Sequence, residues 1–205
     1  MMEGRNWRLG ASLATAALLA ACGGDTTGPG EPVAAGSVSF AYTAHEGAAF
    51  SAQGAPEVDA RGRAQAGTWA AGGRSAQYPG DKVVVTAFVG GSEREGTLFA
   101  LSVPRGRAGR DVPIDVNCAG PECAAGFLLF RVPPQVRDAD PLRSCFINTG
   151  VVRVDDESAG RIRGRFSGRG VCVSDPGAPG NSTFTVESGA FDVAVAEHFR
   201  PDASL

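Results

Sequence analysis

Two histidines, His45 and His198, are the only imidazole bases in the sequence. A serine or cysteine nucleophile needs such a base at hydrogen-bonding distance, and the G-x-S-x-G turn that presents many catalytic serines does not occur. We interpret both histidines as solvated polar residues, His45 in a loop and His198 after the last expected strand. The sequence therefore predicts no enzyme, and a hydrolase with an unrecognised site is the alternative.

The acidic run Asp155-Asp156-Glu157 is a second group with chemical potential, because carboxylate oxygens bind Ca²⁺. Calcium loops space these residues in a D-x-D-x-D-G pattern, whereas here the three acids are consecutive. We interpret the run as the loop of a β-hairpin. Neither a metal nor any other cofactor is expected.

Four arginines form the strongest candidate for a binding surface. Arg161, Arg163 and Arg165 alternate along one expected strand and therefore project from one face, and Arg153 lies on the strand before it. A solvated sheet face explains this pattern, since antiparallel sheets commonly leave one face in water. The alternative is a binding face for anionic groups, such as lipid phosphates or an acidic polysaccharide, which guanidinium groups bind well.

The elements that must position these residues are strands. The 29 glycines and 13 prolines among 205 residues disfavour long helices, and the apolar residues recur with period two. Short strands are expected at residues 37–42, 48–53, 65–70, 82–89, 97–103, 112–116, 127–132, 145–154, 161–167, 171–174, 183–187 and 190–197. Such a series predicts an all-β fold, an antiparallel β-sandwich, with a lipocalin-like β-barrel as the alternative.

Two of these strands, residues 82–89 and 127–132, are apolar at successive positions. Because neighbouring side chains point to opposite faces, we expect both strands to lie centrally with both faces covered. The only segment with any helical character is 134–143, which is polar and flanked by proline.

One hairpin can be predicted in register. Val152 and Val154 must share a face with Ile162 and Phe166, because otherwise one strand would turn its apolar side chains to water. Pairing Asp155 with Arg161 satisfies this requirement and leaves residues 156–160 as the loop.

The N-terminus has the features of an export signal. Arg5 and Arg8 precede an uncharged run over residues 9–21, which is too short to span a bilayer as a helix. The run ends in Leu19-Ala20-Ala21-Cys22, which resembles the lipobox of bacterial lipoproteins. The resemblance covers only residues 5–22 and implies cleavage after Ala21 and lipidation of Cys22. Acyl chains at Cys22 would anchor the protein to a membrane.

The domain boundaries follow from this interpretation. Residues 1–21 are the expected signal peptide, 22–36 the lipidated cysteine and a flexible Gly/Pro tether, 37–200 a single β domain, and 201–205 a tail. Gly23 after the cysteine is the pattern that, in lipoproteins of Gram-negative bacteria, implies delivery to the outer membrane. The predicted location is the cell envelope, with palmitate among the expected acyl groups.

Four cysteines remain besides Cys22. An even number in an exported chain favours disulfides, and the hairpin register brings Cys145 within one residue of Cys172. A one-residue bulge near Gly168 or Gly170 would set the two level. Cys118–Cys123 follows by elimination, and a four-cysteine zinc site is disfavoured because no C-x₂-C pair occurs.

Composition and a weak motif complete the functional expectation. The 19 basic and 22 acidic residues give a net charge of −3, which does not favour nucleic-acid binding. Gly67-Thr68-Trp69 resembles the G-x-W element of lipocalins but comes after two expected strands, whereas lipocalins place it at the first.

We expect a lipid-anchored envelope protein that is a non-catalytic binding or structural module. The alternatives are a lipocalin-like carrier of an apolar ligand and an envelope hydrolase.

Overall fold

The computed structural model describes residues 32–44, 47–59, 64, 67–74, 82–92, 95–117, 120–131, 143–174 and 182–199. These residues form ten strands and no helix, which confirms the all-β prediction. The strands are β1 (Gly36–Ala44), β2 (Gly47–Gly54), β3 (Gly67–Gly73), β4 (Lys82–Ser92), β5 (Glu95–Pro104), β6 (Asp111–Asp115), β7 (Ala125–Arg131), β8 (Arg143–Ser158), β9 (Arg161–Ser174) and β10 (Ser182–Ala194).

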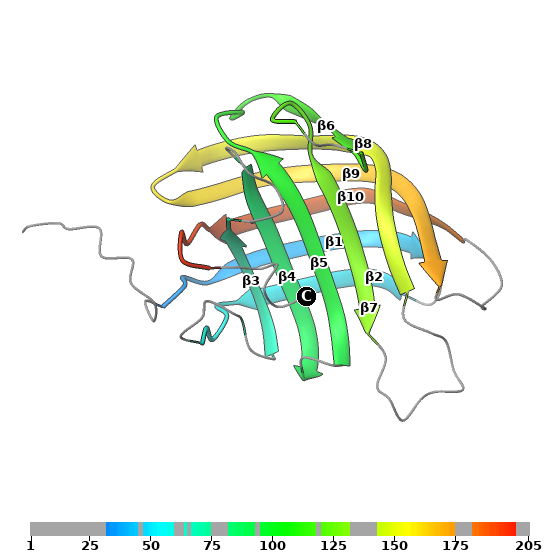
Figure 1. The fold of residues 1–205 in the computed structure, drawn as a ribbon, viewed down its shortest axis with the longest axis horizontal. Coiled ribbons are helices and arrows are strands. Elements are labelled where there is room, and N and C mark those ends of the chain that lie inside the picture. The colour runs from blue at the N-terminus through cyan, green and yellow to red at the C-terminus, as the bar shows by residue number, and fades with distance from the viewer. Residues whose placement is uncertain are drawn as a thin grey trace, which may run out of the picture.

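All ten strands belong to one antiparallel sheet, ordered β2-β1-β10-β9-β8-β7-β5-β4-β3, with β6 paired to the second half of β8. In Figure 1 the strands β1, β2, β8, β9 and β10 run across the view, and β3, β4, β5 and β7 cross in front of them. The sheet therefore folds over on itself into two layers. It is nearly closed into a barrel, because Val195, just after β10, bridges Gly72 of β3 at the far end of the strand order. The architecture is compatible with both the sandwich and the barrel.

The fold-over takes place in β8 and β9. The first half of β8 pairs with β7 and the second half with β6, and a bulge between Ile147 and Thr149 separates the halves. Bulges bend a strand and raise its local twist. The facing residue Gly170 has no side chain, and a Cβ there would lie 1.6 Å from the carbonyl oxygen of Phe146. The bend thus requires glycine.

The space between the layers is filled by apolar side chains, with phenylalanine rings at the centre. Phe40 stacks on Phe50 and touches Phe99, each at a centroid distance of 4.9 Å, and Phe99 stacks on Phe166 at 5.2 Å. All four side chains are at most 5% exposed. Burial of large apolar side chains such as these is the main stabilising contribution to such a fold.

A second apolar cluster covers the outer face of β3, β4 and β5. Trp69, Phe88 and Leu98 pack there beneath Val33 and Phe199, with the rings of Trp69 and Phe199 edge to face. In β4 every residue from 82 to 88 is buried, so the prediction that this strand is covered on both faces is confirmed. In β7 Leu128 is buried and Phe127 half-buried.

The predicted strands correspond to the observed ones, with two differences. The two segments predicted at 161–167 and 171–174 form one continuous strand, β9. The two segments predicted at 183–187 and 190–197 likewise form one strand, β10. The predicted gaps contain Gly168, Gly170 and Gly189, and the pairing of β9 and β10 with a strand on each side keeps the chain extended through them. Packing also begins earlier than the predicted boundary at residue 37, because Val33 is buried and β1 starts at Gly36.

Several sequence predictions lie outside the described residues. They are the signal peptide, Cys22 and the tether up to residue 31, His45, Cys118, most of the segment 134–143, and the tail 201–205. Within the described part of the chain, no helix has the length and hydropathy needed to cross a bilayer.

Candidate binding surface

The β8–β9 hairpin carries the predicted arginine face, and its turn differs from the prediction. Ser158 pairs with Arg161 across a two-residue turn, Ala159-Gly160, whose φ angles of 47° and 72° are both positive. Two-residue hairpin turns favour this backbone because its twist matches that of the strands. The predicted pairing of Asp155 with Arg161 and the loop 156–160 are therefore wrong. The acidic run belongs to β8, not to a loop.

The predicted faces are nevertheless found. Arg153 pairs with Arg165 instead of Arg163, a shift of two residues. A shift by an even number leaves every side chain on its own face, because side chains alternate along a strand. The side chains of Val152, Val154, Ile162 and Phe166 are buried, and Arg153, Arg163 and Arg165 are exposed on the other side, with Arg161 half-buried.

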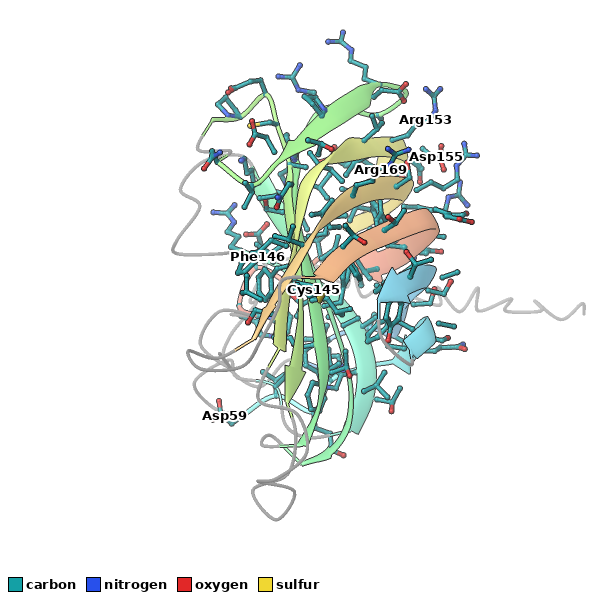
Figure 2. All side chains as sticks on the ribbon, turned by 90° about the vertical axis from the view of Figure 1, so that its right-hand side faces the viewer. Asp59, Cys145, Phe146, Arg153, Asp155 and Arg169 are labelled. Carbon is teal, nitrogen blue, oxygen red and sulfur yellow. A yellow bond between two sulfur atoms is a disulfide. The ribbon has the colours of Figure 1, made fainter. Side chains whose placement is uncertain are left out.

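Three of the four arginines have carboxylate partners. Arg165 donates to both oxygens of Asp155 at 3.1 Å, and Arg153 lies 3.0 Å from Asp111 and 3.8 Å from Asp155. Asp155 is the extra residue of a second bulge, between Val154 and Asp156. Figure 2 shows Arg153 and Asp155 together on the outer side of the sheet.

Arg161 and Arg163 complete the set. Arg161 donates to a carboxylate oxygen of Asp192 at 2.5 Å and to the carbonyl oxygen of Ala35 at 3.2 Å. Arg163 pairs in the ladders with Asp156 and Asp192, and no described carboxylate lies within ion-pair distance of it. The arginines are thus brought together as predicted, but carboxylates of the protein itself neutralise much of their charge.

The ion pair between Asp155 and Arg165 shifts the pKa values of both groups. The hydrogen bond from Arg165 is the main reason that the pKa of Asp155 lies below its ordinary value of 3.8, with further attraction from Arg165, Arg153 and Arg163. Asp155 in turn raises the pKa of Arg165. Both groups stay charged at neutral pH, so the pairs persist there.

The disulfide between Cys145 and Cys172 is present and confirms the prediction. The two cysteines are directly opposed in the β8–β9 ladder with a Cα–Cα distance of 3.9 Å, and both are buried. The bulges that bring them level lie in β8, at residues 148 and 155, and not near Gly168 or Gly170 of β9. Cys123 is also in a disulfide, and its predicted partner Cys118 lies outside the described residues.

A groove next to the arginine face was not predicted from the sequence. It has a volume of about 540 Å³ and crosses the outer sides of β8, β9 and β10 near the bend. The lining residues are Thr149, Gly150, Val151, Ser167, Gly168, Arg169, Thr185, Val186 and Glu187. We call it the Arg169 groove. Arg169 follows the same odd-numbered alternation as Arg161, Arg163 and Arg165. This alternation is the sequence feature from which its place on the same face could have been predicted.

The other predicted chemical groups do not form a site in the described residues. Each acid of the run has a separate partner: Asp155 has Arg165, Asp156 accepts from the Ser158 hydroxyl at 2.9 Å, and Glu157 accepts from the Gly106 amide at 2.7 Å. Among the residues described, no group of three or more His, Cys, Asp or Glu side chains is arranged to hold a metal ion.

His198 differs from its prediction as a solvated residue. Both of its ring nitrogens are shielded from solvent and lack a hydrogen-bond partner in the described structure. The residue precedes Phe199, which is fully buried against Trp69. We therefore assign His198 to the packing of the C-terminal segment over β3.

Comparison of the chain with protein-family models, with curated proteins and with solved structures found no match.

Proposed function

We propose that this protein is a lipid-anchored component of the bacterial cell envelope and that its β domain is a non-catalytic binding module. The binding surface in this proposal is the outer side of β8, β9 and β10, which we call the outer face. It carries the four arginines, their carboxylate partners and the Arg169 groove.

One observation favours a binding surface over an internal ligand site. A lipocalin-like carrier holds its apolar ligand inside the barrel. Here Phe40, Phe50, Phe99 and Phe166 occupy the interior, in ring-to-ring contact and shielded from solvent. A concave surface with polar groups, the Arg169 groove, lies on the outer side of the sheet.

The anchor in this proposal rests on the sequence of the signal segment. Leu19-Ala20-Ala21-Cys22 supplies the lipobox, and residues 22–31 supply a Gly/Pro-rich linker before Val33 packs against the domain. A diacylglyceryl group and an amide-linked acyl chain at Cys22 would hold the protein stably, since each buried CH₂ contributes about 0.8 kcal/mol. The domain would then face its ligand at the membrane surface, the outer membrane in a Gram-negative cell.

The anchor is tested by intact mass and by membrane fractionation of the wild-type protein and of Cys22→Ser. We expect acylated wild-type protein in the membrane fraction and a Cys22→Ser protein without acyl mass. A native protein that is soluble and unacylated would contradict the anchor.

The binding module is tested with the full-length protein in a non-ionic detergent, incubated with anionic envelope material. We expect binding that weakens with added salt, because exposed charges are screened over about 8 Å at physiological ionic strength. A triple variant, Arg153→Gln/Arg163→Gln/Arg165→Gln, should bind less because it leaves Asp111 and Asp155 without these partners. Arg110→Gln removes one exposed arginine beside β6 and serves as the control. Equal binding by the folded triple variant would exclude the arginine part of the outer face.

A further inference from the structure

We propose that the Arg169 groove binds a carboxylated sugar residue within an acidic polysaccharide. This inference rests on the proposed binding module and names its ligand class. The groove is partly open to solvent, and its volume falls in the range of about 300–1,000 Å³ that is usual for small-ligand sites.

The chemistry of the groove is organised around one guanidinium group. Arg169 of β9 pairs with Thr149 of β8 on one side and with Thr185 of β10 on the other. The three side chains therefore form one row across three strands, and Ser167 adds a third hydroxyl on the same face. Figure 2 shows Arg169 on the same side of the sheet as Arg153 and Asp155.

Arg169 differs from the paired arginines beside it. It is exposed, and no ion pair or hydrogen bond joins its side chain to any described residue. Glu187, in the same groove, is likewise exposed and unpaired within the described structure. Both charged groups are thus free to bind a ligand, whereas Arg165 is held by Asp155.

The concave shape has a cause in the sequence. Gly150 and Gly168 stand on the inner side of the sheet, where a Cβ on Gly150 would lie 2.2 Å from the Ser167 carbonyl oxygen and one on Gly168 would lie 2.4 Å from Ile147. With no side chains at these two positions, the backbones of β8 and β9 lie close together here. The irregular pairing between Val186 and Gly189 adds a distortion in β10. The outer surface is therefore hollow over these positions.

The set of lining groups matches a carboxylated sugar. The planar guanidinium of Arg169 can bind a carboxylate through two parallel hydrogen bonds. Thr149, Ser167 and Thr185 can each donate to and accept from sugar hydroxyls, and the Glu187 carboxylate can accept from two adjacent hydroxyls. Val151, with 42% of its surface exposed, offers methyl groups to the C–H face of a sugar ring.

Two other ligand classes fit less well. A phosphate monoester carries about 1.5 to 2 negative charges at pH 7, so Glu187 in the same groove would repel it more strongly than a singly charged carboxylate. An extended peptide that adds a strand needs a free sheet edge. The groove lies on the face of three strands whose backbone groups already pair with one another.

The test measures binding of trigalacturonate to the full-length protein in non-ionic detergent by isothermal titration calorimetry. Its methyl ester, which is neutral but otherwise the same chain, and inorganic phosphate are the comparison probes. We expect the acid form to bind more tightly than the ester and phosphate to compete poorly. Arg169→Gln should weaken acid binding about 10- to 100-fold, as expected for loss of a charge-assisted hydrogen-bond pair, and leave ester binding nearly unchanged.

Arg110→Gln is the control, because Arg110 is an exposed arginine beside β6 that belongs neither to the arginine face nor to the groove lining. Thr185→Val should weaken both forms of the trisaccharide, since it removes a hydroxyl from the row without changing charge.

The groove assignment would be overturned if the acid and the ester bound equally, or if Arg169→Gln bound the acid as well as Arg110→Gln does. Competition by phosphate at the same concentration would assign the groove to a phosphate group instead. Each of these results leaves the binding-module proposal standing if the triple arginine variant still loses binding to envelope material. If the folded triple variant instead keeps its binding to envelope material while trigalacturonate binding still depends on Arg169, the arginine part of the module is contradicted and the groove is not.

Discussion

The two layers of this protein use their outer faces in opposite ways. On the layer of β3, β4 and β5, the outer face is covered by an apolar cluster in which Trp69 and Phe88 pack beneath Val33 and Phe199. On β8, β9 and β10, the outer face carries ion pairs, hydroxyl groups and a groove. Both layers share the aromatic interior, so the difference between them lies only on the outside.

The difference follows from residue pattern. In β4 the residues Val83, Val84 and Val85 are apolar on both sides, and such a strand is stable only when both faces are covered. In β9 from Arg161 to Gly170, apolar or glycine residues alternate with arginine and serine, so one face stays in water. The first layer is structural, and the second is where a ligand can reach polar side chains.

The largest expected effect concerns the bend that joins the layers. Gly170→Ala places a Cβ against the carbonyl oxygen of Phe146, a backbone atom that cannot move aside. We expect a loss of more than about 4 kcal/mol in the free energy of unfolding, or failure to fold, measured by urea denaturation. Gly91→Ala is the control, because Gly91 is exposed and nothing lies within 4 Å of a Cβ there. Equal stability of the two variants would show that the bend does not depend on glycine.

The next effect compares the two outer faces directly. Phe199→Ala removes a fully buried ring from the covered layer and should cost about 3–5 kcal/mol of folding free energy. Val151→Ala removes methyl groups from the outer face of the other layer and should cost less than about 0.5 kcal/mol. Thermal or urea unfolding of both variants tests the comparison. Similar losses would mean that the second layer is also covered in the folded protein.

The third effect tests the covalent link beside the bend. The double variant Cys145→Ala/Cys172→Ala should lose about 2–4 kcal/mol of stability, because the disulfide closes a loop across the hairpin with a sequence separation of 27 residues. Peptide mapping without reductant should recover the Cys145–Cys172 pair. Free thiols at both positions in protein purified without reductant would contradict the link.

The smallest expected effect concerns the ion pair of Asp155 and Arg165. Because the pKa of Asp155 is lower in the folded protein than its ordinary value, the pair stabilises the folded state fully above about pH 4 and progressively less as the pH falls through the folded pKa. Wild type should therefore be more stable than Asp155→Asn at pH 6, and this difference should shrink below pH 4. Urea unfolding at both pH values measures it.

Arg165→Gln supplies the control for that pair, and the double variant Asp155→Asn/Arg165→Gln should lose no more stability than either single variant. A difference between wild type and Asp155→Asn that does not change with pH would show that the pair has no effect on stability.

Local pattern was enough to predict the fold class and the faces of the hairpin. Val152 and Ile162 point inward, and Arg153 and Arg163 point outward. An error of two residues in the predicted register does not change these faces, because side chains alternate with period two. The strands are predicted for the same reason, although β9 and β10 are each predicted as two segments where neighbouring strands hold the chain extended throughout.

The sequence by itself thus determined an all-β chain, its inward and outward residues, and the partnership of Cys145 with Cys172. Only the tertiary structure decided the register, because the two-residue turn and the bulges at residues 148 and 155 depend on how β8 bends between β7 and β6. It also decided that Asp111 and Asp192, distant in the chain, neutralise arginines, and that Arg169 stands between Thr149 and Thr185. Period two predicts which face a side chain occupies, but not which strand will lie beside it.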